Sequence, residues 1–244
     1  RFDHFFTSDD IKIMKIECSI IIPAYNEEKI ILKILKKINQ VFKESSEYEI
    51  IVVDDFSTDS TVNILKQNTE LFNKLISNEK NIGKGGCIKK ALEIAKYNYI
   101  FFQDADDEYD PEDFKKFFEV IDKFNPDLII GSRFNYSSYT KSHYFFNKLG
   151  NFFISNLFNL LNNTTFTDIY SCYIVFKKDL LNPKDLKTFG FDQQAEILSK
   201  IVKKGKKFYE VPINYNGRTY EEGKKIRFYD IFPVIYQIIK SKLF

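Results

Sequence analysis

An acidic cluster directly follows a short apolar run near the middle of the chain. Residues 104–110 read DADDEYD, so five of these seven positions carry a carboxylic acid. Asp104 and Asp106 share one face if the segment is extended, because alternate residues of a strand point to the same side. Two converging carboxylates suit Mg²⁺ or Mn²⁺, which prefer oxygen ligands, and Glu108 is a candidate third ligand. The alternative is a solvated acidic turn that binds nothing.

Three more polar clusters follow apolar, β-branched runs. They read PAYNE at 23–27, DDFSTDST at 54–61 and GSR at 131–133. Ligands of parallel α/β sheets bind beyond the carboxyl ends of the strands, so we expect all four clusters to meet at one edge. Asp54 or Asp55 is a candidate to accept hydrogen bonds from a nucleobase or ribose. A helix cap or a turn is an equally good interpretation of either residue alone.

A glycine-rich segment, NIGKGG at 81–86, is a further candidate for phosphate contact. We expect it to form a loop before a helix at 87–97. Its backbone N–H groups would approach phosphates, with Lys84 nearby. The segment does not match the Walker pattern, and no Gly-x-Gly-x-x-Gly follows the first apolar run, which argues against a dehydrogenase.

The elements that position these residues alternate between strand and helix patterns. Strands are expected at 16–22, 49–53, 75–77, 99–103 and 127–131, with helices at 27–43, 60–69, 87–97 and 112–124 between them. This alternation predicts an α/β fold with a mainly parallel sheet flanked by helices on both faces. The second half is expected to add helices at 144–162, 189–204 and 226–244, with strands within 166–177 and at 208–215.

The composition excludes several functional classes. The chain has 244 residues, 44% of them hydrophobic, and a net charge of +2. No basic stripe with interleaved aromatic residues is present, so nucleic-acid binding is not expected. Three widely spaced cysteines are typical of reduced thiols in a cytoplasmic compartment. No run reaches the ~18 apolar residues of a membrane span, and no signal peptide is recognised in this sequence.

Eight motifs together resemble a known family. In chain order they are SIIIPAYNEE, EIIVVDDFSTDST, NIGKGG, QDADDEYDPED, GSRF, FTDIYSCYIVF, GFDQQAE and EVPINYNGRTYEEGKKI. They resemble the family 2 inverting glycosyltransferases with the Rossmann-like GT-A fold, and more closely the polyprenyl-phosphate sugar transferases typified by dolichyl-phosphate mannose synthase. The resemblance runs from about Ser19 to Lys242. It implies one domain over 1–244, with a nucleotide-sugar-binding half at about 15–135 and an acceptor half at 136–244.

The resemblance also implies roles for individual residues. Nucleotide contacts would come from Pro23, Ala24, Tyr25, Glu27, Asp54, Asp55, Lys84, Asp104, Ala105 and Lys224. The metal, Mg²⁺ or Mn²⁺, would be bound by Asp104, Asp106 and Glu108, although many relatives have Gln at the last position. Catalytic roles would fall on Asp106, Asp168, Arg133 and Arg218, with Asp168 near the transferred sugar and the basic residues on phosphates. A surface charge run is the alternative for Arg218 and Lys224. Cys172, Tyr173 and Ile174 replace the Gly and basic residue that relatives commonly have after the motif's serine.

The expected reaction is transfer of a hexose from a UDP- or GDP-linked sugar to polyprenyl or dolichyl phosphate, with inversion. A lipid phosphate is already ionised at neutral pH, so positioning and electrostatics would supply most of the catalysis. Two other functions remain open. One is transfer to a saccharide hydroxyl of a surface polysaccharide, with Asp168 or a neighbour as base. The other is a catalytically silent module that binds a sugar nucleotide.

A lipid acceptor would give the two apolar segments, 144–162 and 226–244, a place on the membrane surface. Lys and Arg near each segment would meet anionic head groups. The expected location is therefore cytoplasmic and peripheral, at the inner face of the membrane, with a membrane-protein partner as a further expectation. The alternative is that both segments pack against the sheet as ordinary core helices.

Overall fold

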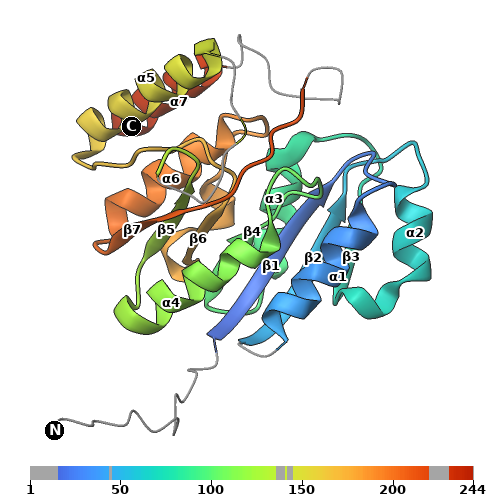
Figure 1. Ribbon diagram of the computed structural model, residues 1–244. Helices are drawn as coiled ribbons and strands as arrows, with labels where there is room; N and C mark the ends of the chain where they lie inside the picture. The colour runs from blue at the N-terminus through green and yellow to red at the C-terminus, as the bar shows by residue number, and fades with distance from the viewer. Residues whose placement is uncertain (1–15, 44–45, 136–140, 142–144, 220–230, 244) are drawn as a thin grey trace, which may run out of the picture.

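The computed structural model describes residues 16–43, 46–135, 141, 145–219 and 231–243. Within these ranges a seven-stranded sheet forms the centre of the molecule, in the order β3-β2-β1-β4-β6-β5-β7 (Figure 1). The strands are β1 (Ile16–Ala24), β2 (Ser46–Asp54), β3 (Lys74–Ser77), β4 (Tyr99–Phe102), β5 (Leu128–Ser132), β6 (Ile174–Lys177) and β7 (Phe208–Pro212). Strand β6 runs antiparallel to β4 and β5, and the other neighbours pair in parallel. The mainly parallel sheet is confirmed.

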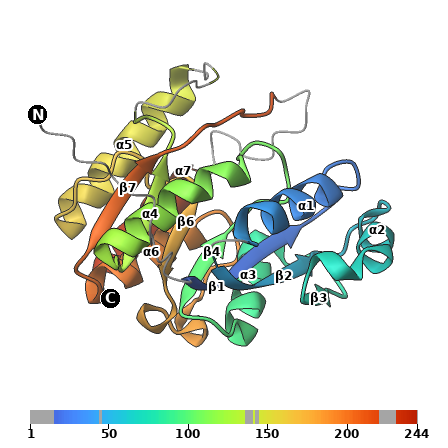
Figure 2. The same cartoon turned by 60° about the horizontal axis from the view of Figure 1, so that its bottom comes forward.

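Helices cover both faces of this sheet (Figures 1 and 2). They are α1 (Ile31–Phe42), α2 (Thr61–Gln67), α3 (Gly83–Ile94), α4 (Phe114–Phe124), α5 (Phe145–Asn162), α6 (Gln193–Lys204) and α7 (Ile231–Leu243). Alternate strand residues feed two separate cores. Ile20 and Ile22 of β1 pack with α1 and α4, whereas Ile21 belongs to the core with α3, α5, α6 and α7. Period-two alternation therefore builds a three-layer α/β/α domain.

The expected loop at 81–86 is wrong from residue 83 onward, because α3 already begins at Gly83. The cause is a contact from another part of the chain. The Asp55 carboxylate, at the end of β2, accepts hydrogen bonds from the backbone N–H groups of Ile82 and Gly83, both at 2.8 Å. These N–H groups would otherwise lack partners in the first helical turn. A remote cap of this kind leaves no mark in the local sequence.

Other boundaries also differ from the expected ones; α6, for example, begins at Gln193 and not at residue 189. Helix α1 begins at Ile31, not at residue 27, because Glu27 donates its N–H to the Thr61 hydroxyl at 2.9 Å and the chain turns before the helix starts. Pro111 opens a single 3₁₀ turn, capped by the Asp110 carboxylate, and α4 starts three residues later at Phe114.

The first turn of α3 lies against the loop that precedes α6. Gly83 has a φ of +80°, in the region that favours glycine. The Gly85 N–H donates to the Phe189 carbonyl oxygen at 2.9 Å. A Cβ atom on Gly85 would lie 2.7 Å from that carbonyl, which is backbone and cannot rotate away. Glycine is therefore required for this close approach.

We predict that Gly85→Ala destabilises the fold by about 2 kcal/mol, because the added methyl group overpacks the backbone of Phe189. Gly150→Ala in α5 is the matched control, since its Cβ would meet Ile231 Cδ1 at an ordinary 3.4 Å. That change should be neutral or stabilising, because Ala favours a helix over Gly. Urea unfolding of both variants measures the difference. Equal midpoints for the two would contradict the close packing at Gly85.

Candidate active site at the carboxyl edge of the sheet

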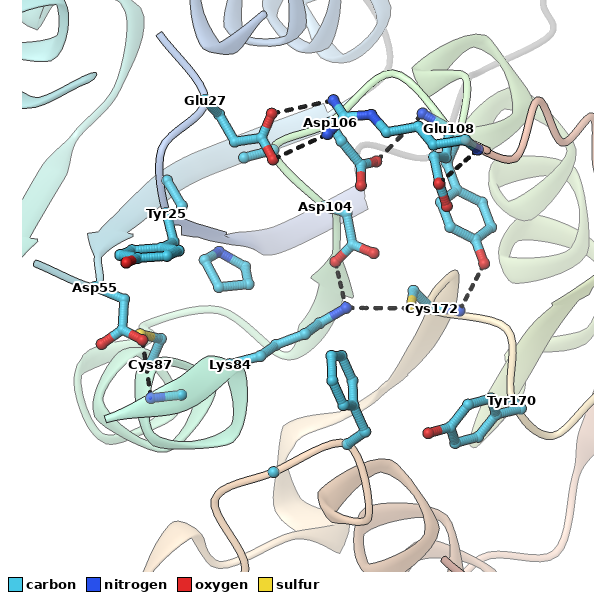
Figure 3. Close-up of a pocket in the computed structure, with 18 of the residues that line it drawn as sticks. Tyr25, Glu27, Asp55, Lys84, Cys87, Asp104, Asp106, Glu108, Tyr170 and Cys172 are labelled. Carbon is cyan, nitrogen blue, oxygen red and sulfur yellow. Dashed lines mark hydrogen bonds and ion pairs between the residues drawn. The ribbon is translucent and has the colours of Figure 1, made fainter. Parts of the chain in front are cut away.

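A cavity of about 280 Å³ lies at the carboxyl ends of the strands (Figure 3). Twelve of the residues singled out from the sequence line it: Pro23, Ala24, Tyr25, Glu27, Asp55, Lys84, Asp104, Ala105, Asp106, Glu108, Arg133 and Arg218. In Figure 3, Tyr25 and Asp55 lie on one side and Cys172 and Tyr170 on the other, with Asp104 between them. The fold thus gathers segments that are far apart in the sequence around one space.

Two of the described sequence-derived candidates, Asp54 and Asp168, do not line this cavity. Asp54 is buried, and its Oδ2 accepts the Ser57 N–H at 3.2 Å, which gives it a role in the turn after β2. Asp168 is fully buried and contacts Arg133, so its carboxylate reaches the cavity only through that side chain. Lys224 lies outside the described residues.

The acid pair Asp104 and Asp106 is half-buried at the cavity wall. Lys84 forms an ion pair with Asp104, whereas Asp106 accepts only the Glu108 N–H, at 3.2 Å, within the described residues. Burial, followed by the charges of Asp104 and Glu108, raises the pKa of Asp106 to about 7. Arg218 lowers this pKa only in part, so burial and the two neighbouring acids dominate.

This donor set fits Mg²⁺ or Mn²⁺. Such ions use one or two protein carboxylates, and take their remaining oxygens from water and substrate phosphates. Asp104 and Asp106 supply two carboxylates in a half-buried site. Among the residues that the structure describes, no cluster of three or more His, Cys, Asp or Glu side chains is arranged to hold a metal by itself. A cation here would therefore depend on oxygens from the substrate.

Glu108 is the least suited of the three expected metal ligands. Its Oε2 accepts the Tyr215 hydroxyl and its Oε1 accepts the Arg218 N–H, both at 2.8 Å. Its backbone carbonyl also accepts the Asn216 N–H at 2.9 Å. Glu108 therefore holds the segment after β7 against the cavity, and its carboxylate oxygens are already hydrogen-bonded.

Lys84 projects from the first turn of α3 toward the acid pair. Its Nζ contacts Asp104 and also Cys172 Sγ, the latter at 3.1 Å. Burial alone would lower the pKa of Lys84, but the Asp104 charge outweighs it and raises the pKa above its usual value. Burial and the Asp104 charge raise the pKa of Cys172 to about 12, so this thiol stays neutral at pH 7. The Lys84 ammonium group is therefore charged at pH 7.

Arg218 brings a second cation to the cavity from the segment after β7. Its guanidinium forms two hydrogen bonds with Glu27, at 3.0 and 3.3 Å, and lies 3.7 Å from Asp107. Burial would lower the pKa of Arg218, but the hydrogen-bonded Glu27 and nearby acids raise it. The first and last of the predicted motifs therefore meet in an ion pair.

Arg133, which lines the cavity, forms an ion pair with the fully buried Asp168 behind it. Arg133 Nε and Nη2 donate to the two Asp168 carboxylate oxygens at 2.7 and 2.8 Å. The Arg133 backbone N–H also donates to Asp168 Oδ2, at 3.0 Å. Burial alone would raise the pKa of Asp168, but the Arg133 charge outweighs it and lowers the pKa.

Sequence reasoning gave no role to several side chains that line the cavity. They are Tyr109, Tyr170, Phe191 and Tyr215, together with Cys87. All but Cys87 lie within the quoted family motifs. Their position in a motif was the only sequence feature that could have indicated a place in the cavity. Cys172, treated in the sequence as a departure from the family pattern, also lines the cavity beside Lys84.

We predict that Asp168→Asn destabilises the fold by about 3 kcal/mol at pH 7, because it leaves the Arg133 charge buried without its partner. The lowered pKa of Asp168 means that its contribution is present above the usual Asp pKa of about 4 and is lost as pH falls through the folded value. Asn is neutral at every pH, so the gap between the two proteins should narrow below about pH 4. Urea unfolding between pH 7 and pH 3 measures it.

The control is Glu112→Gln, which removes an exposed ion pair with Lys115. Exposed pairs contribute little, so this variant should follow the wild type across the pH range. A stability gap for Asp168→Asn that does not change with pH would contradict the assignment of the charge pair.

Comparison with known proteins identifies the family of this chain. Residues 19–182 match the family model of glycosyl transferase family 2. A UDP-N-acetylglucosamine–dolichyl-phosphate N-acetylglucosaminyltransferase of Methanococcus voltae is 30% identical over 246 residues, which cover 92% of this chain and 95% of that protein. A poly(ribitol-phosphate) beta-glucosyltransferase of Bacillus spizizenii is 35% identical over 116 residues, which cover 46% of this chain and 18% of that protein.

Comparison with solved structures identifies a similar fold. The crystal structure of residues 1–349 of S. aureus TarS in complex with UDP-GlcNAc matches with a TM-score of 0.62 at 20% identity. The match covers 93% of this chain and 66% of that one, which is evidence for the fold alone. With the family model covering most of the chain and the sheet arranged as described, the protein belongs to glycosyl transferase family 2 and has the GT-A fold.

Proposed function

We propose that this protein transfers a hexose from a UDP- or GDP-linked sugar to polyprenyl or dolichyl phosphate, with inversion and with Mg²⁺ or Mn²⁺. The observation that carries the proposal is one cavity that combines the acid pair Asp104 and Asp106 with the arginines Arg133 and Arg218. Such a cavity suits a reaction that brings two phosphate-bearing substrates together. The dolichyl-phosphate transferase of Methanococcus voltae, related along nearly the whole chain, supports the same acceptor class.

The donor would occupy the side of the cavity formed by β1, β2 and α3. Pro23, Ala24 and Tyr25 would line the nucleoside pocket, with Asp55 at its end. Asp55 already accepts three hydrogen bonds, from Ile82, Gly83 and Asn78, so it would contact the base from a fixed position. A tightly held carboxylate discriminates between partners better than a mobile one.

The diphosphate of the donor would lie at Asp104, Asp106 and Lys84, with Ala105 lining the same wall. A divalent cation bound there would offset the negative charge that grows on the departing nucleoside diphosphate. Lys84 would share that task as a fixed positive charge in a site partly closed to water. Lys224, outside the described residues, remains a predicted phosphate contact.

The acceptor phosphate would bind on the side of Arg133 and Arg218. In the transfer, an acceptor phosphate oxygen forms a bond to the anomeric carbon while the bond from that carbon to the diphosphate breaks. Asp168 is a poor candidate for a general base, because both of its oxygens accept hydrogen bonds from Arg133 and its pKa is lowered. An acceptor that is already ionised needs no base, which favours a phosphate over a hydroxyl.

Transfer to a saccharide hydroxyl is the second candidate function. It is supported by the relationship to a poly(ribitol-phosphate) glucosyltransferase over 46% of the chain. This reaction would need a carboxylate able to accept the hydroxyl proton at the cavity. Asp168 would have to break a buried ion pair to do so, and we therefore rank this function second.

We further propose that α5 and α7 rest on an anionic lipid surface. The two helices lie side by side at one end of the domain (Figure 1). Six aromatic side chains on them are at least 60% exposed: Phe145, Phe146, Phe152, Phe153, Phe232 and Tyr236. Lys148 and Lys242, on the same helices, are exposed as well. A large apolar patch with neighbouring lysines is typical of an interfacial helix pair.

In the described ranges, none of the helices has the length and the hydropathy to cross a bilayer. We propose a contact at the membrane surface, in which the aromatic face would enter the interface and the lysines would meet anionic head groups.

We predict that Asp106→Asn lowers transfer to dolichyl phosphate by ~100-fold, because the cavity loses one of its two metal-binding carboxylates. In the wild type, UDP or GDP with Mn²⁺ should raise the melting temperature, and the variant should lose that shift. Labelled donor, offered with dolichyl phosphate or with an oligosaccharide, measures the transfer and identifies the acceptor.

Asp110→Asn is the control from the same acidic cluster. Asp110 does not line the cavity, and Asn caps the following turn as well as Asp does. It should keep the wild-type transfer rate. Metal-dependent transfer that survives Asp106→Asn would refute the metal site, and label found only in the oligosaccharide would refute the lipid-phosphate acceptor.

We predict that the double substitution Phe152→Ser and Phe153→Ser reduces binding to phosphatidylserine vesicles at least tenfold, because two exposed rings can no longer enter the interface. Vesicle flotation measures the bound fraction. The control is Ile94→Ser at the far end of α3, which removes an exposed apolar side chain from another surface. Equal vesicle binding by all three proteins would exclude α5 from the lipid contact.

A further inference from the structure

Helix α5 supports the cavity from its buried side. Asn151 is 7% exposed, and its Nδ2–H donates to Asp168 Oδ1 at 2.8 Å. One helical turn later, the Ser155 hydroxyl accepts the Ile169 N–H at 3.3 Å. The helix that exposes its phenylalanines therefore also holds the side chain and the backbone of the segment at 168–169.

The Asp168 carboxylate is fully engaged by this arrangement. Its Oδ1 accepts hydrogen bonds from Arg133 Nη2 and Asn151 Nδ2, and its Oδ2 accepts from Arg133 Nε and the Arg133 backbone N–H. Four donors on two oxygens leave the carboxylate one orientation. Because the guanidinium is planar and pairs with both oxygens, that orientation also sets the plane of the Arg133 side chain.

Arg133 presents the remaining edge of its guanidinium to the cavity it lines. Arg133 Nη1 makes no hydrogen bond with any described residue, and the guanidinium carbon lies 5.0 Å from the centre of the Tyr215 ring. The side chain is thus held between Asp168 and an aromatic ring. A bound anion would meet a guanidinium that is already oriented.

Asn151 also has a feature that stability does not explain. Its Oδ1 is buried and lacks a hydrogen-bond partner within the described part of the chain. A buried acceptor without a partner is unfavourable, and Leu, of similar size, would avoid that cost. What Asn contributes, and Leu cannot, is the N–H donor to Asp168.

We propose that Asn151 is a positioning residue for the transfer reaction, which acts through Asp168 to fix Arg133 for anion binding. The proposal rests on the proposed function for the identity of the anion, an acceptor phosphate. It gives α5 two roles, because its exposed face would meet lipid while its buried face orients a cation in the cavity.

The test begins with Asn151→Leu and binding of inorganic pyrophosphate in the presence of EDTA, measured by calorimetry. The expected result is about tenfold weaker binding, since a hydrogen bond that orients a charged group is lost. Asn156→Leu is the matched control on the exposed face of α5, where the Asn side chain donates a hydrogen bond to the Phe152 carbonyl at 2.8 Å. It should bind pyrophosphate as the wild type does. If Asn151→Leu does not fold, Asn151→Ala, which needs less space, replaces it with the same expected loss.

A double-mutant cycle separates positioning from general structural damage. In an Arg133→Lys background the charge remains but the two-pronged pairing with Asp168 is lost. Asn151→Leu should then change pyrophosphate affinity by less than twofold, because its effect acts through the guanidinium. The same tenfold loss in both backgrounds, wild-type affinity for Asn151→Leu, or an equal loss for Asn156→Leu would overturn the proposal.

Kinetics distinguish this proposal from the function on which it rests. With dolichyl phosphate, Asn151→Leu should lower kcat/KM for the acceptor about tenfold and leave the KM for the donor unchanged. If the wild type transfers sugar to dolichyl phosphate and the variant matches it, the positioning role fails alone. If the wild type transfers sugar to no lipid phosphate while the pyrophosphate cycle holds, the proposed acceptor fails and the positioning of Arg133 stands.

Discussion

Compensation of charge in one half-buried cavity is the constraint on which the rest of this structure depends. Each cation described there pairs with an acid: Lys84 with Asp104, Arg133 with Asp168 and Arg218 with Glu27. Asp106 lacks such a basic partner at hydrogen-bond distance among the described residues, and burial, followed by the charges of Asp104 and Glu108, raises its pKa. Partly buried charges are tolerated only when they are paired or hydrogen-bonded. Under the proposed function, a divalent cation would lie beside the acid pair and offset its charge.

The pairs also tie distant parts of the chain together. Asp55 of the β2 end caps α3 and thereby directs Lys84 toward Asp104. Glu108 holds the segment after β7, which carries Arg218 back to the first motif. Removing one such acid would leave a partly buried cation without its partner. It would also weaken the attachment of one element of the cavity wall. The side chains that would bind substrate under the proposed function therefore also contribute to stability.

Much of the fold could be predicted from the sequence. A helix or strand that buries one face repeats its apolar residues at a regular spacing, and this spacing is visible within a short segment. The strands β1, β3, β4 and β5 and the helices α4 and α5 lie close to their expected positions. The placement of β6 between β4 and β5, antiparallel to both, could not be foreseen, because strand pairing depends on contacts between remote segments. The start of α3 at Gly83 could not be predicted for the same reason, because Asp55, from a remote segment, accepts the hydrogen bonds at its first turn.

The sequence by itself determined the alternation of strands and helices, the family motifs and the identity of the acids at the strand ends. These depend on residue type and on short spacings, which are visible in one dimension. Only the tertiary structure decided which side chains face the cavity, that Glu108 is engaged by Tyr215 and Arg218, and that Asp168 acts behind Arg133 with Asn151 beside it. The physical reason is that a hydrogen bond joins atoms about 3 Å apart in space, whatever their separation along the chain.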